Sequence, residues 1–120
     1  MKKIYYLSTC DTCRKIMQQA NIIKAAGFEL QDIKTSSLTT PQLDALKELA
    51  GSYESLFSRK SMQYKALGLK DVPLTEKDYR NYILQHYTFL KRPVVVIGKE
   101  IFIGSDKGNV ARLVAAAQKA

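Results

Sequence analysis

Two cysteines separated by two residues, Cys10 and Cys13, are the side chains of this chain best suited to chemistry. They follow a short apolar stretch over residues 3–7, which predicts a strand, and they precede a stretch that predicts a helix. A cysteine at the start of a helix faces unpaired backbone N–H groups and the positive end of the helix dipole, which stabilise a thiolate. Because the thiolate is the nucleophilic form, we expect Cys10 to be the attacking residue of a redox site.

Cys13 lies one helical turn after Cys10, so that both sulfurs can approach on one face of the predicted helix. We expect it to act as a resolving thiol, which attacks a mixed disulfide or a sulfenic acid formed on Cys10. A packed, unreactive thiol is the alternative, because free cysteine is often buried. Arg14 follows directly and could hold the thiolate by its charge, or could be a solvated surface residue.

Two further arginines could bind an anion. Arg92 stands before Pro93, at the start of an apolar stretch that predicts a strand over residues 93–97. Arg59 lies in a polar segment that, taken alone, would be read as surface. The planar guanidinium group binds oxyanions and carboxylates through paired N–H groups. The sequence leaves the isomer of the Pro93 peptide bond open.

Composition limits the function classes. The chain has 120 residues, 46% hydrophobic and 25% charged, which fits one soluble domain. A net charge of +8 favours an anionic partner, but there is no basic run and no aromatic interleaving typical of nucleic-acid binding. Apolar runs fall far short of the ~20 residues of a membrane span, and we expect a cytoplasmic protein. Two cysteines and one histidine are too few for an ordinary zinc site, so we expect no metal.

The order of the predicted elements defines a fold. Strands are expected over residues 3–7, 28–33, 93–97 and 99–103, and helices over residues 11–26, from Thr40 as N-cap to Gly51, over residues 75–86, and after Asp106. This order is that of an α/β, thioredoxin-like (glutaredoxin-like) fold: a mixed four-stranded sheet with a helical insertion. We expect a single domain over residues 1–120, with its core in residues 1–34 and 88–120 and the insertion in residues 38–87.

Three stretches, residues 6–15, residues 58–69 and residues 90–104, resemble the ArsC/Spx family. That family comprises glutaredoxin-linked arsenate reductases, their YffB-like relatives and the Spx regulators. The resemblance runs over essentially the whole chain and implies a thioredoxin-like fold. It also implies that no cofactor is bound and that glutathione or glutaredoxin supplies electrons.

For the site, the resemblance implies that Cys10 attacks the oxyanion. Arg59 and Arg92 match two of the three arginines that hold arsenate in the reductases. The third arginine belongs to a Gly-Arg-Pro stretch, where this chain has Gly104-Ser105-Asp106. That ending resembles the YffB-like members, which implies glutathione chemistry. The pair Cys10 and Cys13 resembles the redox switch of Spx, whose partner is RNA polymerase.

Two main hypotheses follow. The favoured one is an enzyme, a thiol-dependent oxidoreductase that uses Cys10 with Arg59 and Arg92 on a small anionic substrate or on glutathione. The alternative is a redox-sensing regulator that binds an RNA polymerase subunit through a switch formed by Cys10 and Cys13. A general disulfide oxidoreductase of thioredoxin type is a third hypothesis, disfavoured by the arginines because a protein-disulfide reductant needs no oxyanion clamp.

Overall fold

The computed structural model describes all 120 residues and divides them into two compact units. The first unit combines Met1–Ser37 with Arg92–Ala120, and the second is Leu38–Lys91. The single domain with an insertion over residues 38–87 stays a prediction. None of the helices has both the length and the apolar character needed to cross a membrane.

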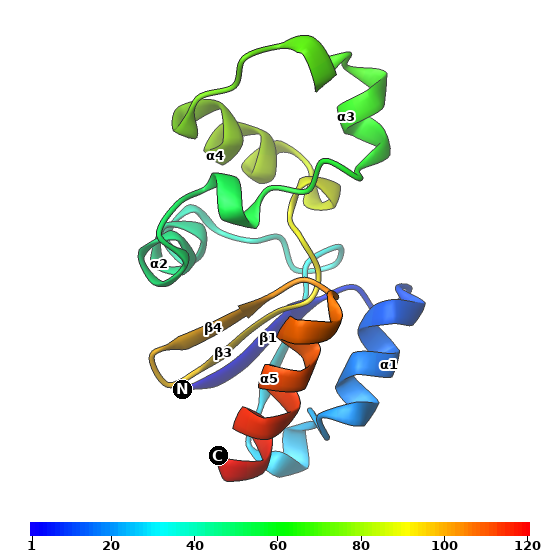
Figure 1. Cartoon of the computed structure of the whole chain (residues 1–120), viewed down its shortest axis with the longest axis vertical. Helices are drawn as coiled ribbons and strands as arrows, with labels where there is room; N and C mark the ends of the chain where they lie inside the picture. Colours follow the sequence, from blue (N-terminus) through cyan, green and yellow to red (C-terminus); the bar gives the residue numbers. More distant parts are fainter. The chain divides into compact units, whose positions relative to one another are not determined.

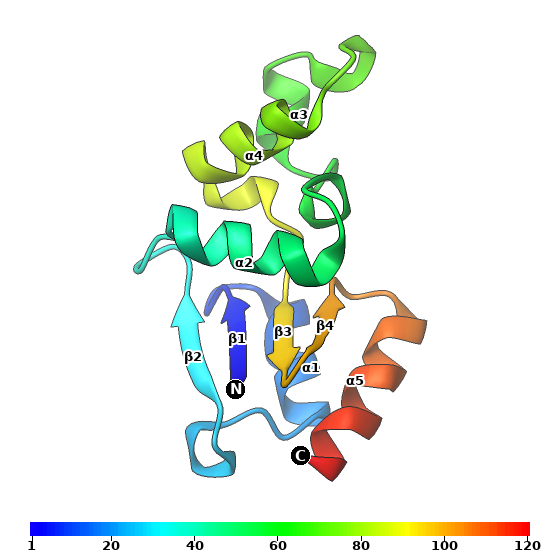
Figure 2. The ribbon, with the colours of Figure 1, turned by 90° about the vertical axis from the view of Figure 1, so that its left-hand side faces the viewer.

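The first unit contains the predicted mixed four-stranded sheet (Figures 1 and 2). Its strands are β1 (Lys2–Tyr6), β2 (Glu29–Asp32), β3 (Val94–Ile97) and β4 (Glu100–Ile103), arranged in the order β2-β1-β3-β4. Strand β1 runs parallel to β2 and antiparallel to β3, and β3 pairs antiparallel with β4. The β1–α1–β2 crossover therefore places the carboxyl ends of β1 and β2 at the same edge of the sheet. This arrangement confirms the thioredoxin-like α/β fold.

Helices α1 (Asp11–Gln19) and α5 (Lys107–Lys119) pack on the same face of this sheet (Figure 1). The core between them and the sheet is formed by buried apolar side chains, among them Ile4, Ile16, Val95, Phe102 and Leu113. The apolar face predicted for the last helix is confirmed, since its residues all join this core: Val110, Leu113, Val114 and Ala117.

The helix predicted over residues 11–26 is shorter than expected. It ends at Gln19, because Asn21 adopts the left-handed conformation with φ 52°. The N–H of Ile22 then donates to the carbonyl of Met17 at 2.9 Å, which closes the helix end in a Schellman motif. The side chain of Ile22 is fully buried as a result, and an asparagine here plays the part usually taken by glycine.

The second unit is helical, with α2 (Thr40–Ala50), α3 (Met62–Ala66) and α4 (Glu76–Gln85). The N-cap of α2 is Thr39 rather than the predicted Thr40. The Thr39 hydroxyl accepts the N–H of Gln42 at 3.2 Å, and the Gln42 side chain accepts the N–H of Thr39 at 3.0 Å. This reciprocal capping box fixes the helix start one residue earlier. Four short 3-10 helices connect the larger elements of the chain: η1 (Lys24–Ala26), η2 (Glu54–Leu56), η3 (Leu69–Asp71) and η4 (Tyr87–Phe89).

An aromatic stack forms the centre of the second unit. Phe57 is fully buried, with its ring 5.3 Å from that of Phe89 and 4.9 Å from that of Tyr79. Phe89 also contacts the ring of Tyr82, at 5.3 Å. Aromatic pairs contribute stability beyond the area that they bury. We therefore expect this stack to stabilise the second unit, whose elements are helices.

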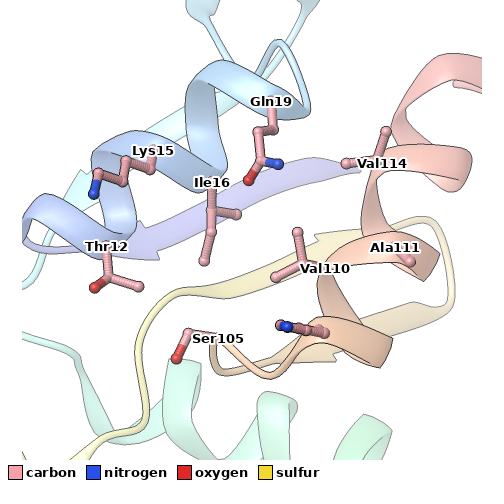
Figure 3. A pocket seen from close by; sticks show the side chains of 9 residues that line it. Thr12, Lys15, Ile16, Gln19, Ser105, Val110, Ala111 and Val114 are labelled. Carbon is pink, nitrogen blue, oxygen red and sulfur yellow. The ribbon is translucent and has the colours of Figure 1, made fainter.

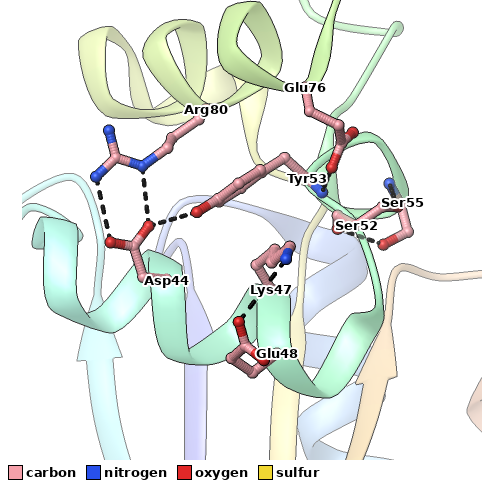
Figure 4. A network of polar contacts seen from close by, with 8 residues as sticks. All are labelled: Asp44, Lys47, Glu48, Ser52, Tyr53, Ser55, Glu76 and Arg80. Carbon is pink, nitrogen blue, oxygen red and sulfur yellow. Dashed lines mark hydrogen bonds and ion pairs between the residues drawn. The ribbon is translucent and has the colours of Figure 1, made fainter.

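A polar network joins α2 to α4 within the second unit (Figure 4). The Asp44 carboxylate accepts two hydrogen bonds from Arg80, at 2.9 and 3.2 Å, and one from the Tyr53 hydroxyl at 2.6 Å. Glu76, at the start of α4, accepts the backbone N–H groups of Tyr53 and Glu54, at 2.7 and 3.0 Å. The charges of this network are therefore matched by partners inside the unit.

Candidate active site

The site begins where β1 and β2 end. The Ser8 hydroxyl donates to the Asp32 carboxylate at 2.6 Å, and the backbone N–H of Lys34 donates to the same carboxylate at 3.1 Å. The hydrogen bond from Ser8 is the main cause that lowers the pKa of Asp32, because it favours the charged carboxylate. These contacts fix the loop that carries the chain from β1 into α1.

Cys10 is the N-cap residue of α1. Its Sγ accepts the backbone N–H of Cys13 at 3.4 Å, in the position where a serine or aspartate oxygen usually caps a helix. Its own N–H donates to the carbonyl of Leu7 at 3.1 Å, which closes the turn. The side chain is partly exposed. The sulfur is thus held against a helix N-terminus and remains open to a reactant.

Cys13 has a different environment. Its side chain is fully buried, and both cysteines are free thiols. The pKa of the Cys13 thiol is raised to about 12, mainly by burial, and a side-chain hydrogen bond with Cys10 contributes to the rise. The pair therefore combines an accessible sulfur with a neutral thiol directly behind it, which can donate a hydrogen bond to a Cys10 thiolate.

Arg92 lies close to the cysteine pair within the first unit. Its charge lowers the pKa of Cys13, against the larger effect of burial. Its Nη1 atom is buried and has no hydrogen-bond partner. The Arg92–Pro93 peptide bond is cis, and the Pro93 carbonyl accepts the N–H of Gly104 at 2.9 Å. The structure therefore brings Arg92 and Pro93, which directly precede β3, close to the cysteine pair at the start of α1.

The turn that follows β4 is fixed by hydrogen bonds with the first turn of α5. Gly104 has φ 85°, a conformation that favours glycine, and its carbonyl accepts a hydrogen bond from Asn109 Nδ2 at 2.9 Å. The Asp106 carboxylate caps α5 by accepting the N–H of Asn109 at 3.0 Å. The side chain of Asn109 is buried. Asp106 is thus engaged in holding the helix start.

The other two arginines predicted to bind an anion, Arg14 and Arg59, form ion pairs with carboxylates. Arg14 forms an ion pair with Asp11 on the exposed surface of α1, rather than a hydrogen bond with a cysteine. Arg59 belongs to the second unit, where its Nη2 donates to Glu54 at 2.8 Å and to the Tyr79 hydroxyl at 2.9 Å. Its guanidinium also lies over the Tyr79 ring, at 5.5 Å. Anion binding by Arg14 and Arg59 stays a prediction.

No group of three or more His, Cys, Asp or Glu side chains gathers in a way that could hold a metal ion. The one histidine, His86, caps η4, since its Nδ1 accepts the N–H of Thr88 at 3.2 Å. The arrangement around Cys10 can support nucleophilic attack by sulfur and binding of a small anion.

Sequence reasoning missed two supporting residues, Asp32 and Asn109. Asp32 is distant from Ser8 in the sequence, and only the parallel pairing of β1 with β2 makes them neighbours. The backbone N–H of Asn109 could have been expected in the cap from its spacing to Asp106, but the hydrogen bond from its side chain to the Gly104 carbonyl has no signal in the sequence.

Comparison with known proteins places this geometry in a family. The model of the ArsC family matches residues 5–113. No curated protein matches the chain significantly.

Several solved structures share the fold. An ArsC family related protein from Bacteroides fragilis is 23% identical, with a TM-score of 0.74, and the match covers 93% of this chain and 96% of that one. An arsenate reductase from Vibrio cholerae is 22% identical, with a TM-score of 0.70 and coverage of 93% and 96%. An arsenate reductase (ArsC) related protein from Brucella melitensis is 22% identical, with a TM-score of 0.69 and coverage of 92% of each chain.

Proposed function

Since the chain belongs to the ArsC family, we propose that it is a thiol-dependent oxidoreductase in which the Cys10 thiolate attacks an oxyanion or a glutathione-linked substrate. Glutathione or glutaredoxin would supply the electrons, and we place the reaction in the cytoplasm, where such thiols are kept reduced. No bound cofactor is required.

The observation that carries this proposal is the pairing of a partly exposed sulfur with an unpartnered guanidinium nitrogen. Cys10 Sγ lies at the N-terminus of α1, and Arg92 Nη1 is buried without an acceptor. A buried donor left without a partner costs about 1–3 kcal/mol, and more when the group is charged. An anionic substrate at Cys10 would supply the missing acceptor, so the site is better satisfied with substrate than without it.

The chemistry needs two thiols for each substrate. With arsenate, Cys10 attacks arsenic, water leaves, and a second thiol completes a disulfide while arsenic(V) becomes arsenic(III). With a glutathione mixed disulfide, Cys10 attacks the glutathione sulfur and the other thiol leaves with the electron pair. Cys13 or a second glutathione then releases Cys10. Where the arsenate reductases have a third arginine, this chain has Ser105 and Asp106, which favours the glutathione-linked substrate.

The test is a coupled assay with the purified protein. Arsenate is supplied with glutathione, glutaredoxin and glutathione reductase, whereas a glutathione mixed disulfide is supplied with glutathione and glutathione reductase alone, because glutaredoxin itself reduces such disulfides. NADPH consumption above that of a blank without the protein is followed. We expect turnover that disappears in Cys10→Ser and persists at a reduced level in Cys13→Ser. Turnover with neither substrate, or turnover that survives Cys10→Ser, would contradict the proposal.

One observation favours a second candidate, an Spx-like redox regulator that binds an RNA polymerase subunit. Cys10 and Cys13 lie in one turn of α1, where Cys10 Sγ accepts the backbone N–H of Cys13 at 3.4 Å and the two thiols interact, which supports a disulfide between them. Mass spectrometry of oxidised protein would show an internal disulfide between these residues. Recovery of polymerase subunits in one redox state only, together with no turnover, would favour the regulator over the enzyme.

A further inference from the structure

A groove runs between α1 and α5 on the surface of the first unit (Figure 3). Its volume is about 590 Å³, within the ~300–1,000 Å³ that small-molecule sites usually have. Nothing in the reaction described above uses it. The lining residues come from α1, from α5 and from the turn that precedes α5, with Thr12, Ile16, Ser105 and Val110 among them.

The groove has a polar end and an apolar floor. Thr12 and Ser105 lie at one end, while Ile16 and Val110 face each other further along (Figure 3). Val114 continues the apolar floor toward the other end, where Gln19 also lines the groove. An apolar floor with a few polar groups is the usual composition of a site that orients a small ligand.

The polar end adjoins the reactive cysteine along the chain. Thr12 is the second residue after Cys10 in the first turn of α1. Ser105 follows Gly104, whose N–H donates to the carbonyl of Pro93. Cys10 does not itself line the groove, which begins two residues later at Thr12. A ligand whose sulfur is bound to Cys10 would have to pass Thr12 and Ser105 to reach it.

The charged residues that line the groove are both lysines, Lys15 and Lys107, and no carboxylate lines it. The nearest acidic residues in the sequence are engaged elsewhere. Asp106 caps α5 and lines a separate cavity, and Asp11 pairs with Arg14. The groove therefore presents a positive rim over an apolar floor.

We propose that this groove binds the non-reacting part of a disulfide substrate whose body is apolar and carries a negative charge. The inference rests on the proposed function, because it requires Cys10 to be the nucleophile. The Cys10 thiolate attacks the sulfur of the half seated in the groove, a new Cys10–sulfur bond forms, and the substrate S–S bond breaks. The other half leaves as a thiolate with the electron pair, so the disulfide itself is the oxidant.

The experiment compares two aromatic disulfides that differ in charge. Dithiobis(nitrobenzoate) carries a carboxylate on each ring, and dithiodipyridine is neutral. Each is mixed with reduced protein in excess, and release of the coloured thiolate or thione is followed by stopped flow. Wild type is expected to prefer the nitrobenzoate disulfide more strongly than free cysteine does under the same conditions.

The contribution of charge is tested with a double variant of the two groove lysines and with a control double variant of two lysines outside the groove. The double variant Lys15→Ser, Lys107→Ser should lower the nitrobenzoate rate about three- to tenfold, the size expected for two exposed charges. Its dithiodipyridine rate should change less than twofold. Lys99→Ser with Lys119→Ser removes the same charge from exposed positions outside the groove and should leave both rates unchanged. Equal effects of the two double variants would overturn the proposal.

The apolar floor is tested with alanines on one helix. Ala111 is exposed and lines the groove, whereas Ala115 is exposed one turn later and does not line it. Ala111→Glu should lower the nitrobenzoate rate at least fivefold, and Ala115→Glu should leave it within twofold. Neither change removes a core side chain, so both variants should fold.

The outcomes distinguish a failure of the groove proposal from a failure of the proposed function. If the wild-type rates exceed those of free cysteine and vanish in Cys10→Ser, but Ala111→Glu behaves like Ala115→Glu, the groove proposal is wrong and the proposed function stands. If Cys10 reacts no faster than free cysteine with either reagent, the proposed function itself is contradicted.

Discussion

Arg92 of the first unit differs from the arginines of the second unit in its hydrogen-bond partners. In the second unit, Arg59 and Arg80 both donate to carboxylates, and both also have a tyrosine close at hand in the same network. In the first unit, Arg92 has a buried nitrogen without any acceptor, beside a cysteine pair. Charges that find partners within the fold stabilise it, whereas a buried charge without one is available to a ligand.

The apolar interiors differ as well. The first unit buries aliphatic side chains between its sheet and two helices, and the second is centred on stacked rings around Phe57. The first arrangement leaves one end of the sheet free to carry loops such as the one at Cys10. The second depends on a few large side chains, so that single substitutions there should have large effects on stability.

The largest expected effect is therefore the loss of the Phe57 ring. Phe57→Ala should lower the free energy of unfolding by about 3–5 kcal/mol, because it removes a fully buried ring that contacts Phe89 and Tyr79. Urea unfolding followed by near-ultraviolet circular dichroism measures it. Phe57→Leu, which refills part of the space, should lose clearly less. A loss below about 1 kcal/mol would mean that the stack is not the centre of this unit.

The next prediction compares Arg92 and Arg59, the two arginines that the family resemblance assigns to anion binding. Arg92→Met should leave the free energy of unfolding unchanged or raise it, because it removes a buried donor without a partner. Turnover with an anionic substrate should fall about ten- to a hundredfold, as expected for a charged hydrogen bond of roughly 1.5–3 kcal/mol.

Arg59→Met should differ from Arg92→Met in its effect on the free energy of unfolding. It removes hydrogen bonds to Glu54 and Tyr79, and it should lower the free energy of unfolding by about 1 kcal/mol or less, since both Arg59 and Glu54 are about half exposed. Chemical unfolding and the coupled assay on both variants give the comparison. Equal losses of stability in the two variants would remove the distinction drawn between the units.

Much of this could be predicted from the sequence, because the informative signals are local. The alternation of apolar residues and the turn glycines predicted four strands in the observed order, and the two cysteines with two residues between them marked the start of α1. The end of α1 was missed because Asn21 takes the left-handed conformation, which sequence patterns assign mainly to glycine.

What the sequence could not show is which groups lie unpaired. The pattern places Arg92 beside a predicted strand and Arg59 in a polar segment, but it does not show which of them has hydrogen-bond partners. Such partners come from residues far apart in the chain, such as Tyr79 for Arg59. The burial of Cys13 is likewise decided by packing against the core, not by its spacing from Cys10. The groove between α1 and α5 arises from two segments about ninety residues apart, which the sequence does not present as neighbours.

The buried thiol predicts an alkaline dependence of stability. The pKa of the Cys13 thiol is raised from 9.0, the ordinary value of a thiol and that expected in the unfolded chain, to about 12 in the folded state. The unfolded state thus binds fewer protons between these values, and stability should fall as the pH rises through this range. Cys13→Ala should flatten that slope, which urea unfolding at several pH values measures. An unchanged slope would place the Cys13 thiol in contact with water.

The smallest expected effect concerns the polar network of the second unit. The hydrogen bonds from Arg80 and Tyr53 lower the pKa of Asp44 from 3.8 to about 2, so the charged carboxylate favours the folded state. This contribution is present above the unfolded value and is lost as the pH falls from about 3.8 toward 2. Asp44→Asn should lower the thermal midpoint slightly at neutral pH and weaken its fall in acid.

A matched control is Asp71→Asn, which removes a carboxylate of the same unit that makes no ion pair and no hydrogen bond. Its thermal midpoint and acid dependence should follow those of wild type. Because Asp44 and Arg80 are partly exposed, added salt should also reduce the difference between wild type and Asp44→Asn. If both asparagine variants behave alike, the network that joins α2 to α4 adds nothing to stability, and the aromatic stack alone holds the second unit together.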